Sequence, residues 1–137
     1  MKDDCIFCKL ANGVFATNSV YEDEDFNVIL DVGPATKGHL LILPKEHYDN
    51  LYELPEELCG KAMKLAKKMA VHLRDRLKCD GLNIVQNNGE AAGQTVMHYH
   101  LHVIPRYKDD GQNMLWNPTE PGNEKLEELC DEIKEGL

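Results

Sequence analysis

The sequence has no long apolar run. Its longest, Leu40–Leu43, is far shorter than the roughly 20 residues of a membrane-spanning helix, and Met1–Cys5 carries no apolar segment of signal-peptide length. An excess of positive charge is also missing, since 15 Lys and Arg stand against 24 Asp and Glu, a formal net charge of −9. We therefore expect a cytoplasmic protein whose overall charge favours neither nucleic acid nor membrane surfaces as partners.

Cysteine is present in an odd number that argues against a disulfide framework. The five cysteines are Cys5, Cys8, Cys59, Cys79 and Cys130. Without a secretory segment, such residues are thiols or metal ligands more often than disulfides. Disulfides are also unnecessary, because 137 residues can bury a core of their own as one domain.

Short β-rich runs separated by acidic or Gly/Pro turns occupy the first part of the chain. They predict strands over residues 20–22, 26–31 and 39–43, which we expect to form an antiparallel meander. Two further extended runs are expected at residues 82–86 and 97–105. The chain therefore supplies a sheet of about five strands.

One long helix is predicted between the third and fourth strands. Pro55 suits its first turn, and apolar residues then recur every three or four positions, at Leu58, Ala62, Leu65, Met69, Leu73 and Leu77. A short helical turn is expected at residues 6–10 and an acidic helix from Glu124 onward. The fold class is α+β, an antiparallel sheet of about five strands with one long helix packed across it and short N-terminal and C-terminal helices.

Three of the six histidines alternate along the last predicted strand, at His98, His100 and His102. Alternation puts their side chains on one face at intervals of ~6.7 Å, while the residues between them face the core. Two chemistries remain open at this point. Three ligands spread over roughly 13 Å cannot all reach one ion, so at most two could share a metal. The alternative is nucleophilic catalysis by one imidazole, assisted by its neighbours.

The loop before these histidines is rich in glycine and in neutral hydrogen-bond donors. Gly89 and Gly93 allow close approach of backbone N–H groups to an anion, and Asn87, Gln94 and Thr95 add side-chain donors. A phosphate-binding loop and a plain turn between strands are both compatible with this composition.

Two segments together resemble the histidine triad (HIT) family. Residues 93–104, GQTVMHYHLHVI, are similar to the family's His-φ-His-φ-His-φ-φ signature with its preceding Gly-Gln-Ser/Thr, and residues 31–47 are similar to its second landmark. The resemblance runs from about Cys5 to Arg106. It implies a single HIT domain over residues 1–137, with its core at about 5–106 and a C-terminal extension at 107–137.

The resemblance implies a hydrolase that attacks the α-phosphorus of a nucleotide. His100 would be the nucleophile that forms a covalent nucleotidyl-histidine, His102 would bind the phosphoryl oxygens, and His39 would support the triad. The further substrate-binding residues implied are Asn87, Gly93, Gln94 and Thr95 around the phosphate and Asp31 on the ribose hydroxyls. From the sequence, Asp31 is equally suited to capping a turn, and Phe7, Leu10 and Phe26, which could flank a base, are more typical of the core.

Within the family, the chain is similar to the bacterial Hint-like branch. That branch implies purine nucleoside phosphoramidates or related nucleoside 5′-monophosphate derivatives as substrates and a homodimer as the assembly. Two alternatives stay open: a dinucleoside polyphosphate hydrolase of the Fhit-like branch, toward which Gly93–Val96 leans, and a nucleotide-binding regulator without turnover.

Cys5 and Cys8 form a single Cys-x-x-Cys motif, which by itself is compatible with zinc, redox chemistry or idle thiols. A redox motif of the thioredoxin type should follow a strand, and only four residues precede Cys5. The resemblance to HIT proteins pairs these cysteines with His47 and His98. It thus implies a structural Zn site of the Cys₂His₂ type.

Overall fold

A five-stranded antiparallel sheet forms the centre of the computed structural model, which describes residues 1–137. The strand order is β1-β2-β3-β5-β4, so the meander of the first three strands is extended by the last strand before the edge strand β4 is reached. The strands are β1 (Ser19–Glu22), β2 (Phe26–Leu30), β3 (Leu40–Pro44), β4 (Gly81–Val85) and β5 (Leu101–Arg106). The predicted fold class is confirmed.

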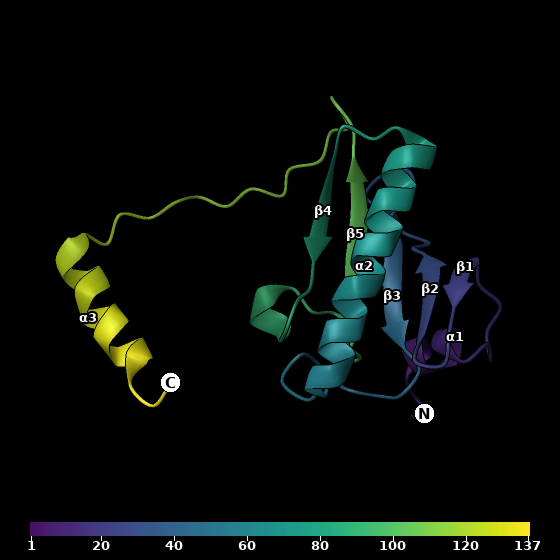
Figure 1. Ribbon diagram of the computed structural model, residues 1–137, viewed down its shortest axis with the longest axis horizontal. Coiled ribbons are helices and arrows are strands. Elements are labelled where there is room, and N and C mark those ends of the chain that lie inside the picture. The colour runs from purple at the N-terminus through teal and green to yellow at the C-terminus, as the bar shows by residue number, and fades with distance from the viewer.

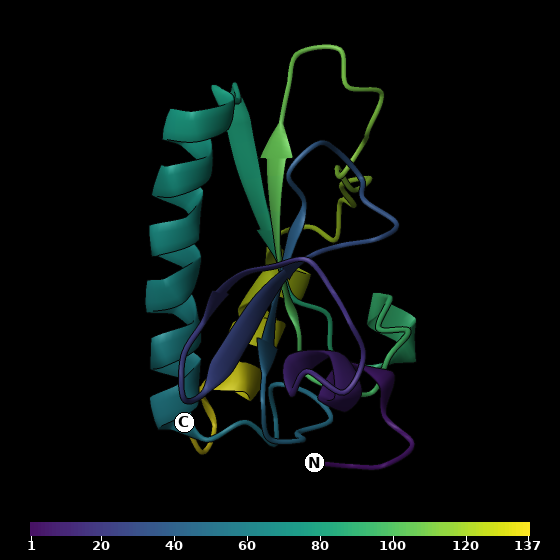
Figure 2. The same cartoon turned by 90° about the vertical axis from the view of Figure 1, so that its right-hand side faces the viewer.

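The helix α2 (Glu56–Leu77) covers one face of this sheet (Figures 1 and 2). Pro55 precedes its first residue, and the predicted apolar stripe faces the strands. The main core lies between α2 and the sheet and includes Leu65 and Met69 from the helix and Ile42 and Leu101 from the strands. None of the helices combines the length and the apolar composition that a membrane-spanning helix needs.

The other face of the sheet carries the short helix α1 (Ile6–Ala11), which lies opposite α2 in Figure 2. A second, smaller apolar cluster forms there from Ala11, Ile29, Leu41 and Leu43. Because β3 contributes alternate residues to both clusters, all five of its residues are buried, which explains why the longest apolar run of the sequence lies in this strand.

The last strand begins later than predicted. Residues 97–105 were expected to be extended, but β5 starts at Leu101, where pairing with β3 begins. Before that point the chain bends, with the His98 N–H bonded to the Val96 carbonyl and the Tyr99 N–H bonded to the Tyr48 carbonyl, outside the sheet. His98 and His100 therefore lie in an irregular segment, and only His102 belongs to the strand.

Beyond β5 the chain leaves the sheet. Residues 113–122 are extended and carry the helix α3 (Asn123–Lys134) away from the rest of the molecule, as Figure 1 shows. Every residue of α3 is exposed. The expected C-terminal helix is thus present, but it does not pack against the body of its own chain.

Gly38, just before His39 and β3, tests how closely this segment packs against α2 and β5. Its φ is +90°, and a Cβ atom there would lie 2.5 Å from Leu77 Cδ1 and 3.3 Å from Pro105 Cγ. We expect Gly38→Ala to lower the free energy of unfolding by about 1–3 kcal/mol in denaturant titration. Gly60→Ala, inside α2 with open space around it, should instead raise it by up to about 1 kcal/mol. Equal stability of the two variants would contradict this account.

Candidate active site

A cavity of about 530 Å³ opens on the α1 face of the sheet. Its wall combines α1, the ends of β2 and β3, the glycine-containing loop and the histidine segment. Of the residues predicted to act on a substrate, those that line the cavity are Asp31, Asn87, Gly93, Thr95, His100 and His102. The volume lies in the range of small-ligand sites.

The orientation of His100 is fixed by a hydrogen bond to the backbone of His98. Its Nδ1 lies 2.8 Å from the carbonyl oxygen of His98, and because a carbonyl only accepts, Nδ1 carries the proton. The Nε2 atom therefore keeps its lone pair. Burial lowers the pKa of His100 and so favours the neutral imidazole, although the hydrogen bond to His98 acts in the opposite direction. The result is a neutral ring with an unprotonated nitrogen in a ligand-sized cavity.

His102 is oriented by a chain of hydrogen bonds that starts at the backbone. The Ala35 N–H donates to His39 Nδ1 over 2.9 Å, which leaves the proton of neutral His39 on Nε2. His39 Nε2–H in turn donates to His102 Nδ1, also over 2.9 Å. The remaining proton of His102 is therefore on Nε2, so that this ring offers a donor where His100 offers a lone pair.

Asp31, His39 and His102 lie close enough together to suggest a metal site, but their protons argue against one. A neutral imidazole has a ring lone pair on only one of its two nitrogens. In His39 this nitrogen is Nδ1, which accepts from the Ala35 N–H, so Nε2 carries the proton and cannot bind a metal. Asp31 Oδ2 instead lies 3.5 Å from His39 Nε2, and Asp31 Oδ1 accepts from the Gly33 N–H over 2.8 Å. Asp31 thus caps a turn and also lines the cavity, so its two interpretations are compatible.

The glycine-containing loop divides its residues between the cavity and the interior. Gly93 has a φ of +92°, and a Cβ there would meet the Asn87 side chain at 3.5 Å, so glycine keeps the amide of Asn87 at the cavity wall. Gln94 was expected to donate to a substrate, and the structure corrects this. Its side-chain amide is buried and donates to the carbonyls of Asp49 and Val96, so it holds the loop in place.

The three residues considered for a base pocket lie on different faces of the sheet. The Phe7 and His100 rings pack edge to face with their centroids 4.9 Å apart, and Phe7 and Leu10 both line the cavity. Phe26 lies on the other face of the sheet, buried in the core beneath α2, and takes no part in the cavity. The sequence does not indicate the roles of the Ala35 N–H, which donates to His39, and of the Pro44 carbonyl, which accepts from His98 Nε2, because a residue's type does not say where its N–H or carbonyl will point.

A cluster of cysteines and histidines adjoins the cavity through His98. The Nδ1 atom of His98 lies 3.4 Å from the sulfur of both Cys5 and Cys8, and 3.3 Å from Nδ1 of His47. Cys8 Sγ is also 3.3 Å from His47 Nδ1. The fold thus brings together four potential metal ligands from three distant parts of the sequence.

The donor set of this cluster fits a tetrahedral metal ion. His98 Nε2 donates to the Pro44 carbonyl over 2.9 Å, and His47 Nε2 donates to Asp49 Oδ1 over 2.7 Å, so both Nδ1 atoms present lone pairs to the centre. Metal–sulfur and metal–nitrogen bonds of ~2.3 and ~2.05 Å in a tetrahedron separate two nitrogen ligands by roughly 3.3 Å and a sulfur from a nitrogen ligand by roughly 3.6 Å. The observed separations of 3.3–3.4 Å agree with that geometry.

Comparison with known proteins shows that the chain is similar to members of a single family. The model of the HIT domain family matches residues 12–109. The protein Protein hit of Bacillus subtilis is 44% identical over 128 residues, which span 93% of this chain and 88% of that protein. The Saccharomyces cerevisiae protein named Adenosine 5′-monophosphoramidase HNT1 is 35% identical over 131 residues, covering 94% of this chain and 80% of the relative.

Solved structures agree with the fold over nearly the whole chain. A HIT family protein from Bacillus subtilis superposes with a TM-score of 0.91 at 40% identity and covers 98% of both chains. A histidine triad family protein from Mycobacterium smegmatis, described as Zn-bound, superposes with a TM-score of 0.77 at 35% identity and also covers 98% of both chains.

The hydrogen-bond chain through His102 predicts an acid-sensitive fold. Burial, together with His100 and His39, lowers the pKa of His102 from 6.5 to about 4 in the folded protein. As the pH falls from 6.5 toward 4, the unfolded chain binds a proton that folded His102 resists, so the free energy of unfolding falls, for this residue by about 3 kcal/mol.

Thermal unfolding measured between pH 7 and pH 4 tests this loss of stability, because His102 titrates over approximately that range in the unfolded and folded states. His102→Gln should unfold with a weaker dependence on pH than the unmodified chain. His72→Gln, which alters an exposed histidine of α2, serves as the matched control and should keep the full dependence. The same slope for all three proteins would contradict the assignment.

Proposed function

The chain belongs to the HIT domain family, and from that membership and the geometry of its cavity we propose that it is a nucleotide hydrolase of the phosphoramidase type. Its substrates would be purine nucleoside phosphoramidates or related nucleoside 5′-monophosphate derivatives, attacked at the α-phosphorus. The observation that carries the proposal is the neutral His100 ring, whose Nδ1–H is held by the His98 carbonyl while Nε2 remains free.

In the first step, the lone pair of His100 Nε2 forms a bond to phosphorus, and the bond from phosphorus to the leaving group breaks with its electron pair. The ring gains positive charge as this happens, and the hydrogen bond from Nδ1–H to the His98 carbonyl stabilises that charge. Water then attacks phosphorus and breaks the phosphorus–nitrogen bond, which returns the lone pair to His100 and releases the nucleoside monophosphate.

The neighbouring donors would stabilise the negative charge that develops on the phosphoryl oxygens. His102 Nε2–H is fixed as a donor by its bond from His39, and Asn87, Gly93 and Thr95 line the same cavity. These groups are oriented before a substrate arrives, so little reorganisation is needed during the reaction. His39 would therefore be a positioning residue that acts through His102.

The cavity also contains groups that suit a nucleoside. Asp31 presents a carboxylate that can accept from the two hydroxyls of a ribose. Phe7 and Leu10 provide an apolar wall next to His100, against which a base could pack. The yeast relative's name states an adenosine 5′-monophosphate derivative as its substrate, which supports a purine here.

We further propose that Cys5, Cys8, His47 and His98 hold a structural zinc ion. Their donor set and spacing suit it, and a structural neighbour is described as Zn-bound. A bound zinc would supply a crosslink between the N-terminus and the histidine segment and no step of the reaction. We also propose that the protein acts in the cytoplasm as a homodimer.

Replacement of His100 tests the reaction. His100→Ala should lower kcat/KM for an adenosine phosphoramidate by at least about a thousandfold, because the attacking nitrogen is lost. His72→Ala, which is exposed on α2, should retain full activity. Mass spectrometry of acid-quenched protein should find an added nucleotidyl mass on the peptide that contains His100. Turnover by His100→Ala, or binding without turnover by the unmodified protein, would refute the proposal.

Removal of the metal tests the zinc site separately. Cys8→Ser should lose bound zinc in elemental analysis and should lower the melting temperature by about 5 °C or more, because a buried crosslink is lost. Cys130→Ser, which alters an exposed cysteine on α3, should retain both the metal and the melting temperature. A purified protein that contains no zinc, yet melts at the same temperature with added zinc as with a chelator, would refute the site.

A further inference from the structure

The loop that joins β2 to β3, residues 31–39, contains the group that fixes the proton of His39. Its Ala35 N–H donates to His39 Nδ1 over 2.9 Å. This bond lies outside the helices and strands, and the backbone of the loop adds bonds only from the Asp31 N–H to the His39 carbonyl and from the His39 N–H to the Thr36 carbonyl. Ala35 therefore depends on other parts of the chain for its exact position.

The opposite arrangement of protons would remove a donor from the cavity. If His39 carried its proton on Nδ1, its Nε2 would accept from His102 Nδ1–H, and His102 Nε2 would present a lone pair to a phosphoryl oxygen. The Ala35 N–H disfavours this arrangement because it would face a second donor. Asp31 Oδ2, 3.5 Å from His39 Nε2, favours the same arrangement as Ala35 does. The position of Ala35 thus helps to decide which atom of His102 faces a substrate.

Three side-chain hydrogen bonds tie this loop to the end of β5 and to the residues that follow it. Figure 2 shows the two segments side by side at one end of the sheet. The bonds run from Thr36 Oγ1 to the Pro105 carbonyl, from the Tyr107 hydroxyl to the Lys37 carbonyl, and from the Gln112 amide to the Ala35 carbonyl. The last of these, over 2.9 Å, holds the same residue whose N–H contacts His39.

Gln112 is itself held by an ion pair between Arg106 and Asp110. Arg106 Nε and Nη2 donate to the two Asp110 carboxylate oxygens over 2.8 and 3.0 Å, and Nη2 also donates to the Gln112 carbonyl over 2.8 Å. The Gln112 N–H donates to Asp110 Oδ1 over 3.0 Å. The bonds from Arg106 and from the backbone hold the pKa of the Asp110 carboxyl well below its usual range, so the pair is charged at neutral pH. We call Arg106, Asp110 and Gln112 the clip.

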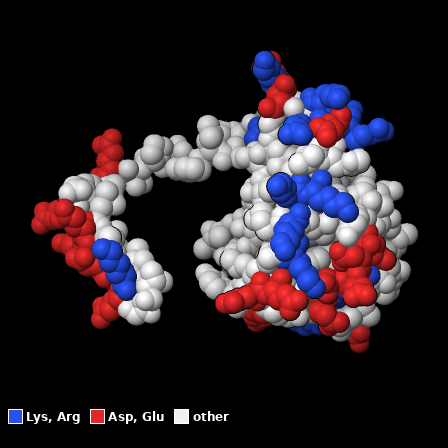
Figure 3. Space-filling view, in the orientation of Figure 1, with Lys and Arg blue, Asp and Glu red and all other residues white.

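The clip is anchored to the sheet as well as to the loop. Arg106 is the last residue of β5, and its Nη1 donates to Asn83 Oδ1 on β4 over 2.8 Å. The Arg106 carbonyl accepts from the Asp80 N–H, just before β4, over 2.8 Å. Charged side chains of both signs gather at this end of the body, from which the extended residues 113–122 depart (Figure 3). Two strands therefore hold the base from which Gln112 reaches Ala35.

We propose that Gln112 is a positioning residue, which acts through the Ala35 backbone to keep His39 and His102 in the arrangement of protons described above. Arg106 and Asp110 hold Gln112 in place for this role. The consequence for turnover rests on the proposed function, whereas the arrangement of protons does not. The first residues of the C-terminal extension thereby influence a cavity that none of residues 107–112 lines.

Replacement of Gln112 in the full-length protein tests the proposal. Gln112→Glu keeps the shape of the side chain but replaces its donor by an acceptor, so the Ala35 carbonyl loses its partner. We expect kcat for an adenosine phosphoramidate to fall by about three- to tenfold and KM to change by less than about twofold, because the cavity keeps its lining. Asn113→Asp makes the same change of charge where the side chain contacts only the Leu115 N–H, and should leave kcat unchanged.

Nitrogen NMR of the histidine rings reads the positions of the protons without any substrate. A neutral ring with a fixed proton gives two widely separated ¹⁵N signals, and exchange of the proton between the two nitrogens averages them. In Gln112→Glu we expect the signals of His39 and His102 to move toward each other within each ring. The signals of His100, which is held by the His98 carbonyl, should keep their separation.

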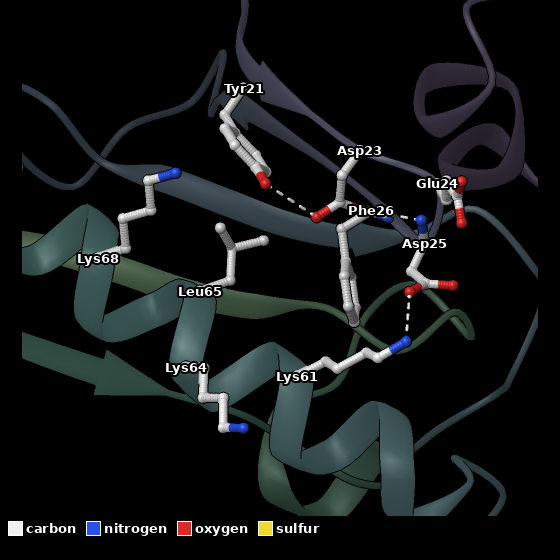
Figure 4. A pocket seen from close by; sticks show the side chains of 9 residues that line it. All are labelled: Tyr21, Asp23, Glu24, Asp25, Phe26, Lys61, Lys64, Leu65 and Lys68. Carbon is white, nitrogen blue, oxygen red and sulfur yellow. Dashed lines mark hydrogen bonds and ion pairs between the residues drawn. The ribbon is translucent and has the colours of Figure 1, made fainter.

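The ion pair of the clip has a matched counterpart on the other face of the sheet. Asp25 pairs with Lys61 over 3.0 Å at the pocket between α2 and the β1–β2 turn (Figure 4). Asp110→Asn should release Gln112 and reproduce the effects of Gln112→Glu on kcat and on the NMR signals. Asp25→Asn, which also removes a paired carboxylate, should change neither.

A double variant shows whether Gln112 acts through His39. In a His39→Gln background, Gln112→Glu should lower kcat by less than about 1.5-fold, because the bond that it supports is already lost. Full additivity overturns the positioning role, and so does a fall in kcat while the His39 and His102 signals stay in place. Equal movement of the His100 signals indicates general loosening and also overturns it. If the unmodified protein does not turn over the phosphoramidate, the proposed reaction fails, and the NMR comparison still decides whether Gln112 sets the protons.

Discussion

The hydrogen bond from His100 Nδ1–H to the carbonyl of His98 connects the two halves of the site. It fixes the proton of His100 on one nitrogen and leaves the other with a lone pair, which the proposed attack on phosphorus requires. The same residue, His98, directs its ring into the cluster of Cys5, Cys8 and His47. His98, which is fully buried, therefore positions the reactive His100.

This arrangement depends on the bend before β5. If the predicted strand had begun at Met97, regular alternation would have placed the three histidines side by side on one sheet face. The chain instead bends at Val96–His98, so the His98 ring enters the metal-binding cluster while His100 remains at the cavity. The bend lets two adjacent histidines of the triad take different roles without competing for the same space.

Opposite faces of the sheet serve different purposes. The face beneath α2 contains the main core and provides rigidity, whereas the face near α1 carries a smaller apolar cluster and the cavity. The strand β3 belongs to both, and His39, immediately before it, orients His102 through a bond supported by the Ala35 backbone.

Most of the elements, the family and most of the predicted residues around the cavity could be inferred from the sequence alone, although the start of β5 could not. Periodicity located α2 and its buried stripe, and the histidine pattern with its preceding Gly93 and Thr95 indicated the site, because these features depend on neighbours along the chain. Only the tertiary structure decided which protons the histidines carry, that Gln94 supports the loop from inside, and that Phe26 belongs to the other face. Those outcomes depend on backbone carbonyls and N–H groups from distant segments, and their directions are set when the strands pair, which no residue type records.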